Sequence, residues 1–448
     1  MKSLYLKIFL LLFVVMISII VLWYTGLEVP IFFVFAVFTV FIFIAGNIKY
    51  REINNPFTLY CIGWLIPLSL AQIKLSNIQR NYTSETWVLI LTATMFFVIP
   101  CFIMLPMVKK KAIIKVKYNV ERLYCPIIAI AFIAALSMLF NWYSIGGIPL
   151  IVGDNNASHL TSAKFINYFI YMAPPLSGLA ILYLVLGGKK YRKIMYLIVM
   201  LPYMYAVLQM LRSLILSCIY YQAMYLYITL RIKGYDTSSV FKKIRIPIFV
   251  LLITLVVLMP VIGNYRVQSM YGDESVGNDF WVDNVNLKQK SSTLAWVYSY
   301  YCMGFDNLDL CINNYEGPLL YGYNTLVPIT GPTQIKRLWT ITPEDIDSQI
   351  PRTWGAAVGT YLRDLYIDGG IWFAILITFI YSFLVNYFYH RGTNGFIKLR
   401  YFAVYTGISY AIIYMFFNAG VLSSPPILIN SLMVFYILGR YTYIENTK

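Results

Sequence analysis

Residues 248–259 read Ile-Phe-Val-Leu-Leu-Ile-Thr-Leu-Val-Val-Leu-Met, an apolar run without a single charge. A strand of a membrane barrel alternates apolar and polar residues, and this run does not. Because lipid offers no partner for an unpaired backbone amide, such a run crosses a membrane as a helix. Runs of about 17–25 apolar residues, long enough to span a bilayer, recur along the chain. The sequence therefore predicts an all-α polytopic membrane protein.

The composition favours the same class. Of 448 residues, 60% are hydrophobic and 12% are charged, whereas a soluble domain carries about 25% charged residues. The net charge of +16 raises the alternative of a nucleic-acid-binding protein. The lysines and arginines gather in short loops on one side of the apolar runs, as membrane topology requires. We therefore expect membrane lipid, and no nucleic acid, as a partner.

About twelve transmembrane helices are predicted. The first has no small-x-small cleavage site, so we interpret it as an uncleaved span. The seventh and eighth are the least distinct, because only Arg212 and Ser213 separate them. The predicted spans are 8–24, 29–48, 57–73, 87–108, 124–142, 165–186, 194–210, 214–230, 246–263, 370–389, 401–417 and 426–439.

The orientation follows from the basic residues. With the N-terminus inside, 24 of the 35 lysines and arginines fall on the inner side, which predicts that both termini are cytoplasmic. One large periplasmic or extracellular loop then separates helices 9 and 10. The predicted parts are transmembrane helices 1–9 (1–263), a large outer loop domain (264–369) and helices 10–12 (370–448). Within the loop, Leu294–Met303 and Leu319–Val327 are expected to form helices at the membrane interface.

Cysteines, histidines and motifs restrict the chemistry. Cys302 and Cys311 share the outer loop, in an oxidising compartment, so a disulfide between them is compatible with the sequence. The chain has no nucleotide-binding loop, and its two histidines, His159 and His390, exclude a histidine-rich metal site. A carboxylate-bound divalent ion stays open, but we predict no cofactor and no metal.

Four arginines are predicted near the outer phosphate layer: Arg212, Arg266, Arg352 and Arg363. Each alone is compatible with a side chain that merely extends to the interface. Together they flank the spans that open into the large loop. Because guanidinium groups stay charged and bind two oxygens at once, the four arginines suit a pyrophosphate.

The large loop ends in a segment that brings several polar groups to the membrane edge, Thr360-Tyr361-Leu362-Arg363-Asp364-Leu365-Tyr366-Ile367-Asp368-Gly369-Gly370. Two interpretations of Asp368 stand side by side. In one, it only caps the helix that follows. In the other, it also lines an active site.

This layout resembles the O-antigen and capsule polysaccharide polymerases, the Wzy-type oligosaccharide repeat-unit polymerases. The shared features are about a dozen spans, an outer Gly-Gly-Ile-Pro-Leu at 146–150, an Arg-Ser at 212–213, and Thr-x5-Tyr-x-Asp-x-Gly at 360–370. Family members often carry an aromatic residue between the aspartate and the glycine, where this chain has Gly369.

The resemblance implies polymerisation of undecaprenyl-pyrophosphate-linked repeat units at the outer face of the bacterial inner membrane. The growing glycan moves en bloc, and undecaprenyl pyrophosphate is released. The implied partners are these lipid-linked glycans, as donor and acceptor, and a chain-length-determining co-polymerase. Arg212, Arg266 and Arg363 would hold the pyrophosphate, with Arg352 as a fourth candidate. The general base would be Asp368, Asp364 or Asp306.

Two other functions stay open. An O-antigen ligase would transfer the finished glycan to lipid A core, but such ligases carry a histidine in the large loop and residues 264–369 contain none. A polysaccharide flippase or transporter would also have about twelve spans. Transporters typically show internal repeats and short loops, and this chain shows no repeat and one very long loop.

Overall fold

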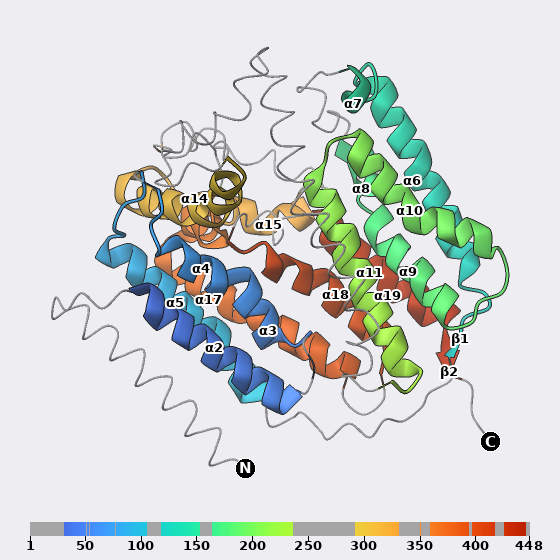
Figure 1. The fold of residues 1–448 in the computed structure, drawn as a ribbon, viewed down its shortest axis with the longest axis horizontal. Helices are drawn as coiled ribbons and strands as arrows, with labels where there is room; N and C mark the ends of the chain where they lie inside the picture. The colour runs from blue at the N-terminus through green and yellow to red at the C-terminus, as the bar shows by residue number, and fades with distance from the viewer. Residues whose placement is uncertain are drawn as a thin grey trace. The chain divides into compact units, whose positions relative to one another are not determined.

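A computed structural model describes residues 31–50, 52, 54–76, 78–104, 118–152, 164–235, 292–330, 350, 359–393, 397–416 and 425–444. The described residues are mostly helical (Figure 1). The chain divides into two compact units. The first comprises residues 1–109, 282–390 and 411–423, and the second comprises residues 110–281, 391–410 and 424–448.

The first unit is built from long apolar helices and two helices of the predicted outer loop. Figure 1 shows α2, α5 and α17 running side by side, and stacked rings of Tyr60 and Phe97, 3.8 Å apart, join α3 to α5. The helices are α2 (Ile31–Tyr50), α3 (Pro56–Tyr60), the π-helical turn η1 (Cys61–Leu65), α4 (Ile66–Ala71), α5 (Ser84–Met104), α14 (Ser292–Asn314), α15 (Tyr323–Thr330) and α17 (Tyr361–Thr393).

Local sequence explains where these helices begin. The Asn55 side chain accepts a hydrogen bond of 2.9 Å from the Thr58 amide, and Pro56 occupies the first helical position of α3. Both residues are typical of helix starts, because asparagine satisfies a free amide and proline has none. Further along, η1 passes close to other backbone. A Cβ on Gly63 would lie 1.9 Å from the Ile412 carbonyl oxygen, so only glycine fits there.

The second unit contains the remaining helices, except for the last three residues of α18, which belong to the first unit, and one short pair of strands. Gly178 lets α9 and α11 approach closely, since a Cβ there would lie 2.4 Å from the Tyr225 ring. The antiparallel strands β1 (Tyr118–Asn119) and β2 (Tyr443–Ile444) pair Tyr118 with Ile444 and Asn119 with Tyr443. The helices are α6 (Tyr124–Ser144), α7 (Pro149–Val152), α8 (Lys164–Ile170), α9 (Ala173–Val185), α10 (Arg192–Leu208), α11 (Arg212–Ile232), α18 (Leu399–Ile413) and α19 (Pro425–Tyr441).

Five helical segments of the described chain are long and apolar enough to cross a membrane: Ser84–Met104, Tyr124–Val152, Ile166–Val185, Ser213–Ile232 and Tyr361–Thr393. Val34–Ile44, Pro56–Ala71 and Ile427–Tyr441 are shorter apolar helices. The predicted class, a mostly helical protein with helices long and apolar enough to cross a membrane, is therefore confirmed for the described residues. The number of twelve spans and the orientation stay predictions.

Within the described residues, helices occupy ten of the twelve predicted spans. The other two, 8–24 and 246–263, lie outside these residues. The uncertain seventh and eighth spans are separate helices, α10 and α11. Their break falls slightly earlier than predicted, at residues 209–211, where Met210 has a φ of +55°. Arg212 is therefore the first residue of α11, rather than part of the turn.

Candidate functional site

The segment that closes the large outer loop folds as a short helix followed by a break. Residues 361–368 are helical, and the helix resumes after Gly369 and Gly370. Gly370 has a φ of +76° and a ψ of −171°, a conformation that residues with a Cβ rarely adopt. The two glycines thus separate the polar helix 361–368 from the long apolar part of α17.

Asp368, the last residue of this short helix, is completely buried. One carboxylate oxygen accepts a hydrogen bond of 3.0 Å from the Asn324 amide. The other accepts two hydrogen bonds of 2.7 Å, from the amide and the hydroxyl of Thr325. Both donors lie at the start of α15, where free amides favour an anion. Asp368 therefore caps α15, and not the helix that follows it in the chain.

Backbone contacts strengthen this junction. The Leu320 amide donates to the Ile367 carbonyl at 3.0 Å, and the Gly322 amide donates to the Asp368 carbonyl at 3.3 Å. Beside these bonds lies a small apolar cluster, which comprises Cys311, Tyr315, Leu320, Ile350 and Ile367. The segment that leads into α15 is thereby fixed to the short helix at the start of α17.

Arg363 lies on the same short helix and is buried, with a side chain only 7% exposed. Its Nη1 lies 3.8 Å from a carboxylate oxygen of Asp364, whose side chain is 21% exposed. Gly359 makes the room for it, since a Cβ there would lie 2.2 Å from Arg363 Cδ. A buried guanidinium is costly unless it has an anionic partner. Arg363 is thus a preplaced positive charge beside a carboxylate that water can reach.

Helix α14 lies across the end of α4 and the start of α5 (Figure 1). A stripe of residues on one face of α14, Tyr298, Cys302, Asp306 and Asp309, follows helical spacing. At its start, the Tyr298 hydroxyl accepts a hydrogen bond of 3.0 Å from the Leu75 amide and donates one of 2.7 Å to Gln79. The connection between α4 and α5 is therefore held against α14.

Asp309 fixes the other end of that connection. One of its oxygens accepts hydrogen bonds from the Thr83 amide at 2.8 Å, the Thr83 hydroxyl at 3.1 Å and the Thr86 hydroxyl at 2.7 Å. Thr83 immediately precedes α5, so Asp309 satisfies one amide and two hydroxyls at the start of that helix. Its role here is structural.

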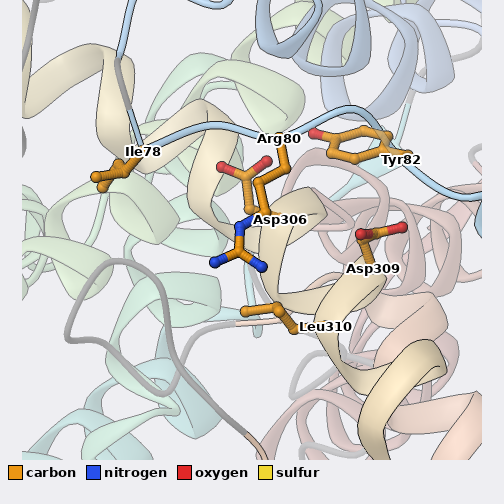
Figure 2. A pocket seen from close by; sticks show the side chains of 6 residues that line it. All are labelled: Ile78, Arg80, Tyr82, Asp306, Asp309 and Leu310. Carbon is orange, nitrogen blue, oxygen red and sulfur yellow. The ribbon is translucent and has the colours of Figure 1, made fainter.

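Asp306 faces a small pocket between α14 and the same connection (Figure 2). The pocket admits about 10 Å³ of water, about the room for one molecule. Figure 2 shows the Tyr82 hydroxyl directed toward the Asp306 carboxylate, with the Arg80 guanidinium nearby. The lining residues are Ile78, Arg80, Tyr82, Asp306, Asp309 and Leu310.

The Asp306 carboxylate influences the pKa of two titratable groups near this pocket. Burial raises the pKa of Tyr82 well above its usual value, and the Asp306 carboxylate raises it further. Burial also lowers the pKa of Lys74, while Asp306 opposes that shift. Asp306 is itself only 4% exposed. The buried carboxylate of Asp306, the phenol of Tyr82 and nearby basic groups thus lie close together beside α14.

The elements that carry Asp306 and Arg363 touch. A Cβ on Gly304 would lie 3.4 Å from the amide nitrogen of Thr360 and 2.3 Å from the carbonyl oxygen of Phe416. Trp64 packs against both Phe305 and Tyr361, with ring centroids 5.0 and 4.9 Å away. The middle of α14 and the start of α17 are therefore parts of one packed region.

The other predicted arginines are not brought to this region by the described residues. Arg212 begins α11 in the second unit, and its side chain lies outside the description. Arg266 and Arg352 lie outside the described residues. A clamp of four arginines therefore stays a prediction. Conversely, Lys74, Arg80 and Tyr82 are not among the residues that the sequence predicts for the site. The signal available for them was two basic residues, Lys74 and Arg80, in one short loop between two predicted spans.

The structure answers the question that the sequence left open for Cys302 and Cys311, because it contains no disulfide between them. Both are free, buried cysteines of α14. Nine residues along a helix correspond to a rise of about 13.5 Å and to opposite faces, whereas a disulfide needs Cα atoms within about 7 Å. Among the described residues, no three His, Cys, Asp or Glu side chains gather as a metal ion would require.

Comparison with protein-family models, with curated proteins and with solved structures finds no match to this chain.

Proposed function

We propose that this protein polymerises undecaprenyl-pyrophosphate-linked oligosaccharide repeat units into O-antigen or capsular polysaccharide. The proposed place is the outer face of the bacterial inner membrane. It would be a multi-pass glycosyltransferase that moves the growing glycan en bloc and works with a chain-length-determining co-polymerase. The sequence resemblance at 146–150, 212–213 and 360–370 motivates this function.

The burial and the ionic partner of Arg363 are the observations that support this proposal most. Arg363 is a buried cation, packed over Gly359 and paired with Asp364, on the short polar helix that ends at Gly369. A glycan transfer from a lipid pyrophosphate develops negative charge on the leaving phosphate. A preplaced guanidinium stabilises that charge without reorganising during the reaction.

The proposed reaction needs a base and a leaving group, and no nucleotide. The hydroxyl oxygen of the acceptor sugar attacks the anomeric carbon of the donor glycan. The bond from that carbon to the phosphate oxygen breaks, and undecaprenyl pyrophosphate departs with the bonding pair. A carboxylate takes the hydroxyl proton. In this scheme, Arg363 stabilises the pyrophosphate, and Arg212, Arg266 and Arg352 are further candidates for the same task.

The contacts of the three candidate carboxylates change the order in which we consider them as the general base. Asp368 has both oxygens engaged by α15 and no exposed surface, so we assign it a positioning role. Asp364 is partly exposed beside Arg363, and Asp306 faces a pocket that holds about one water. We propose that one of these two carboxylates accepts the proton, and that Asp364 is the first to test.

The lipid-linked species in a deletion strain separate this function from its rivals. A missing polymerase predicts single repeat units that accumulate on the outer leaflet. Repeat units trapped on the cytoplasmic leaflet would indicate a flippase and overturn the proposal. Long lipid-linked chains that never reach lipid A core would indicate a ligase instead.

A further inference from the structure

The second unit contains a pocket of about 440 Å³ that the proposed reaction does not use. It lies where the two short strands meet the start of α18 and the end of α19. Its lining residues are Tyr118, Lys398, Leu399, Arg400, Tyr401, Leu438, Gly439, Thr442, Tyr443 and Ile444.

Contacts between distant parts of the chain form the pocket. Residues 118–119 pair with residues 443–444 as antiparallel strands. The Tyr118 hydroxyl donates a hydrogen bond to the carbonyl of Ile397, and burial raises the pKa of Tyr118 to about 12. Tyr118 thereby ties the strand pair to the segment that enters α18.

The lining is positively charged. Lys398 and Arg400 flank the start of α18, and none of the described residues that line the pocket is acidic. Arg400 lies over the rings of Tyr401 and Phe435, 5.0 and 5.5 Å from their centroids. These contacts favour a fixed guanidinium plane. The first turn of α18 adds the partial positive charge of a helix N-terminus.

The position of the pocket fits a membrane ligand. The predicted orientation places residues 390–400 and the C-terminal end of α19 at the cytoplasmic face, where anionic phospholipids attract basic groups. Apolar groups of Leu399, Leu438 and Ile444 border the same pocket. A ligand with a phosphate and an apolar part suits this mixture better than a free ion does.

We propose that this pocket binds the phosphate of an anionic phospholipid headgroup, held by Lys398 and Arg400. This pocket shares no residue with the proposed active region, and lipid binding there does not depend on polymerase activity.

The test uses the full-length protein, purified in detergent and then reconstituted in nanodiscs of phosphatidylcholine with added phosphatidylglycerol or cardiolipin. Native mass spectrometry counts the retained lipids. The double variant Lys398→Ala/Arg400→Ala is expected to bind the anionic lipid about ten-fold more weakly. The matched control is Lys189→Ala/Lys193→Ala, which removes two exposed lysines on the same predicted face.

A second pair of variants leaves the charges unchanged. A Cβ on Gly439 would lie 4.0 Å from Arg400 Cδ, an ordinary contact, so Gly439→Ala is expected to bind like the parent. Gly439→Leu is expected to fill the space and lose the lipid. Size-exclusion profiles establish that each variant is folded.

Equal anionic-lipid binding by the parent, the double variant and Gly439→Leu would overturn the proposal. So would displacement of the lipid by millimolar inorganic phosphate, because the pocket would then recognise free phosphate. Retention of lipid in high phosphate, lost only in the double variant and Gly439→Leu, supports the lipid headgroup.

Discussion

Asp368 and Thr325 are joined by two hydrogen bonds of 2.7 Å, in which one carboxylate oxygen accepts from both the amide and the hydroxyl of Thr325. The two residues stand 43 positions apart. This contact fixes the start of α15 to the short helix that carries Arg363. Because this contact engages the carboxylate of Asp368, we propose a positioning role for Asp368 instead of that of the general base.

Removal of this contact should loosen α15. Asp368→Ala removes a helix cap, which is worth about 0.5–2 kcal/mol, and should increase hydrogen exchange in residues 315–330. Thr325→Ala should reproduce part of that effect, and Asp368→Asn should be milder than Asp368→Ala because it keeps one acceptor. A general base would behave differently: Asp368→Asn would then be as inactive as Asp368→Ala, with unchanged exchange in α15.

Arg363 should be sensitive to its geometry as well as to its charge. We expect Arg363→Ala to lower polymer formation by about 10²–10³-fold, the usual loss when a charge-stabilising group is removed. Arg363→Lys keeps the charge without the planar fork and should recover only part of the activity. Gly359→Ala forces Arg363 to shift, so it should reduce activity with Arg363 intact. Arg391→Ala, at the other end of α17, is the control. Full activity in Gly359→Ala would argue against a preplaced guanidinium.

Tyr82 should make stability depend on alkaline pH. Burial and Asp306 raise its pKa in the folded protein, so above about pH 10, the usual tyrosine pKa, the unfolded chain loses a proton that the folded chain keeps. The stabilising contribution is complete below that pH and is lost as the pH rises through the folded pKa. Tyr82→Phe should therefore have a smaller decrease in melting temperature between about pH 8 and 11. An identical decrease in both proteins would contradict the placement of Tyr82 beside Asp306.

Cys302 and Cys311 should both be free thiols in protein isolated without reductant. After unfolding, a maleimide reagent should label each of them, and peptide mapping should find no bridged pair. Reductant should leave the melting temperature unchanged, because no cross-link restrains the unfolded chain. A bridged peptide would mean that residues 302–311 are not one continuous helix.

The helices were readable from the sequence, while the contacts that build the site were not. Long apolar runs such as 84–104 have few other solutions in lipid, so the helices fall close to the predicted spans. The sequence placed Gly369 and Gly370 at the start of the tenth predicted span, but it did not predict that a helix would precede them and break there. By contrast, Asp309 accepts a hydrogen bond from Thr86, which lies 223 positions away in the sequence. Contacts between such distant residues leave no periodic pattern in the sequence. A disulfide between Cys302 and Cys311 stayed open because the sequence did not show that residues 302–311 form one continuous helix. A helix separates the two sulfurs.

The most direct measurement is polymerisation by the purified protein in lipid vesicles, supplied only with a synthetic undecaprenyl-pyrophosphate-linked repeat unit. We expect a glycan ladder, one undecaprenyl pyrophosphate released for each new linkage, and loss of both products in Arg363→Ala but not in Arg391→Ala. Movement of the intact lipid-linked unit across the bilayer without any new linkage, or an undiminished ladder from Arg363→Ala, would contradict it.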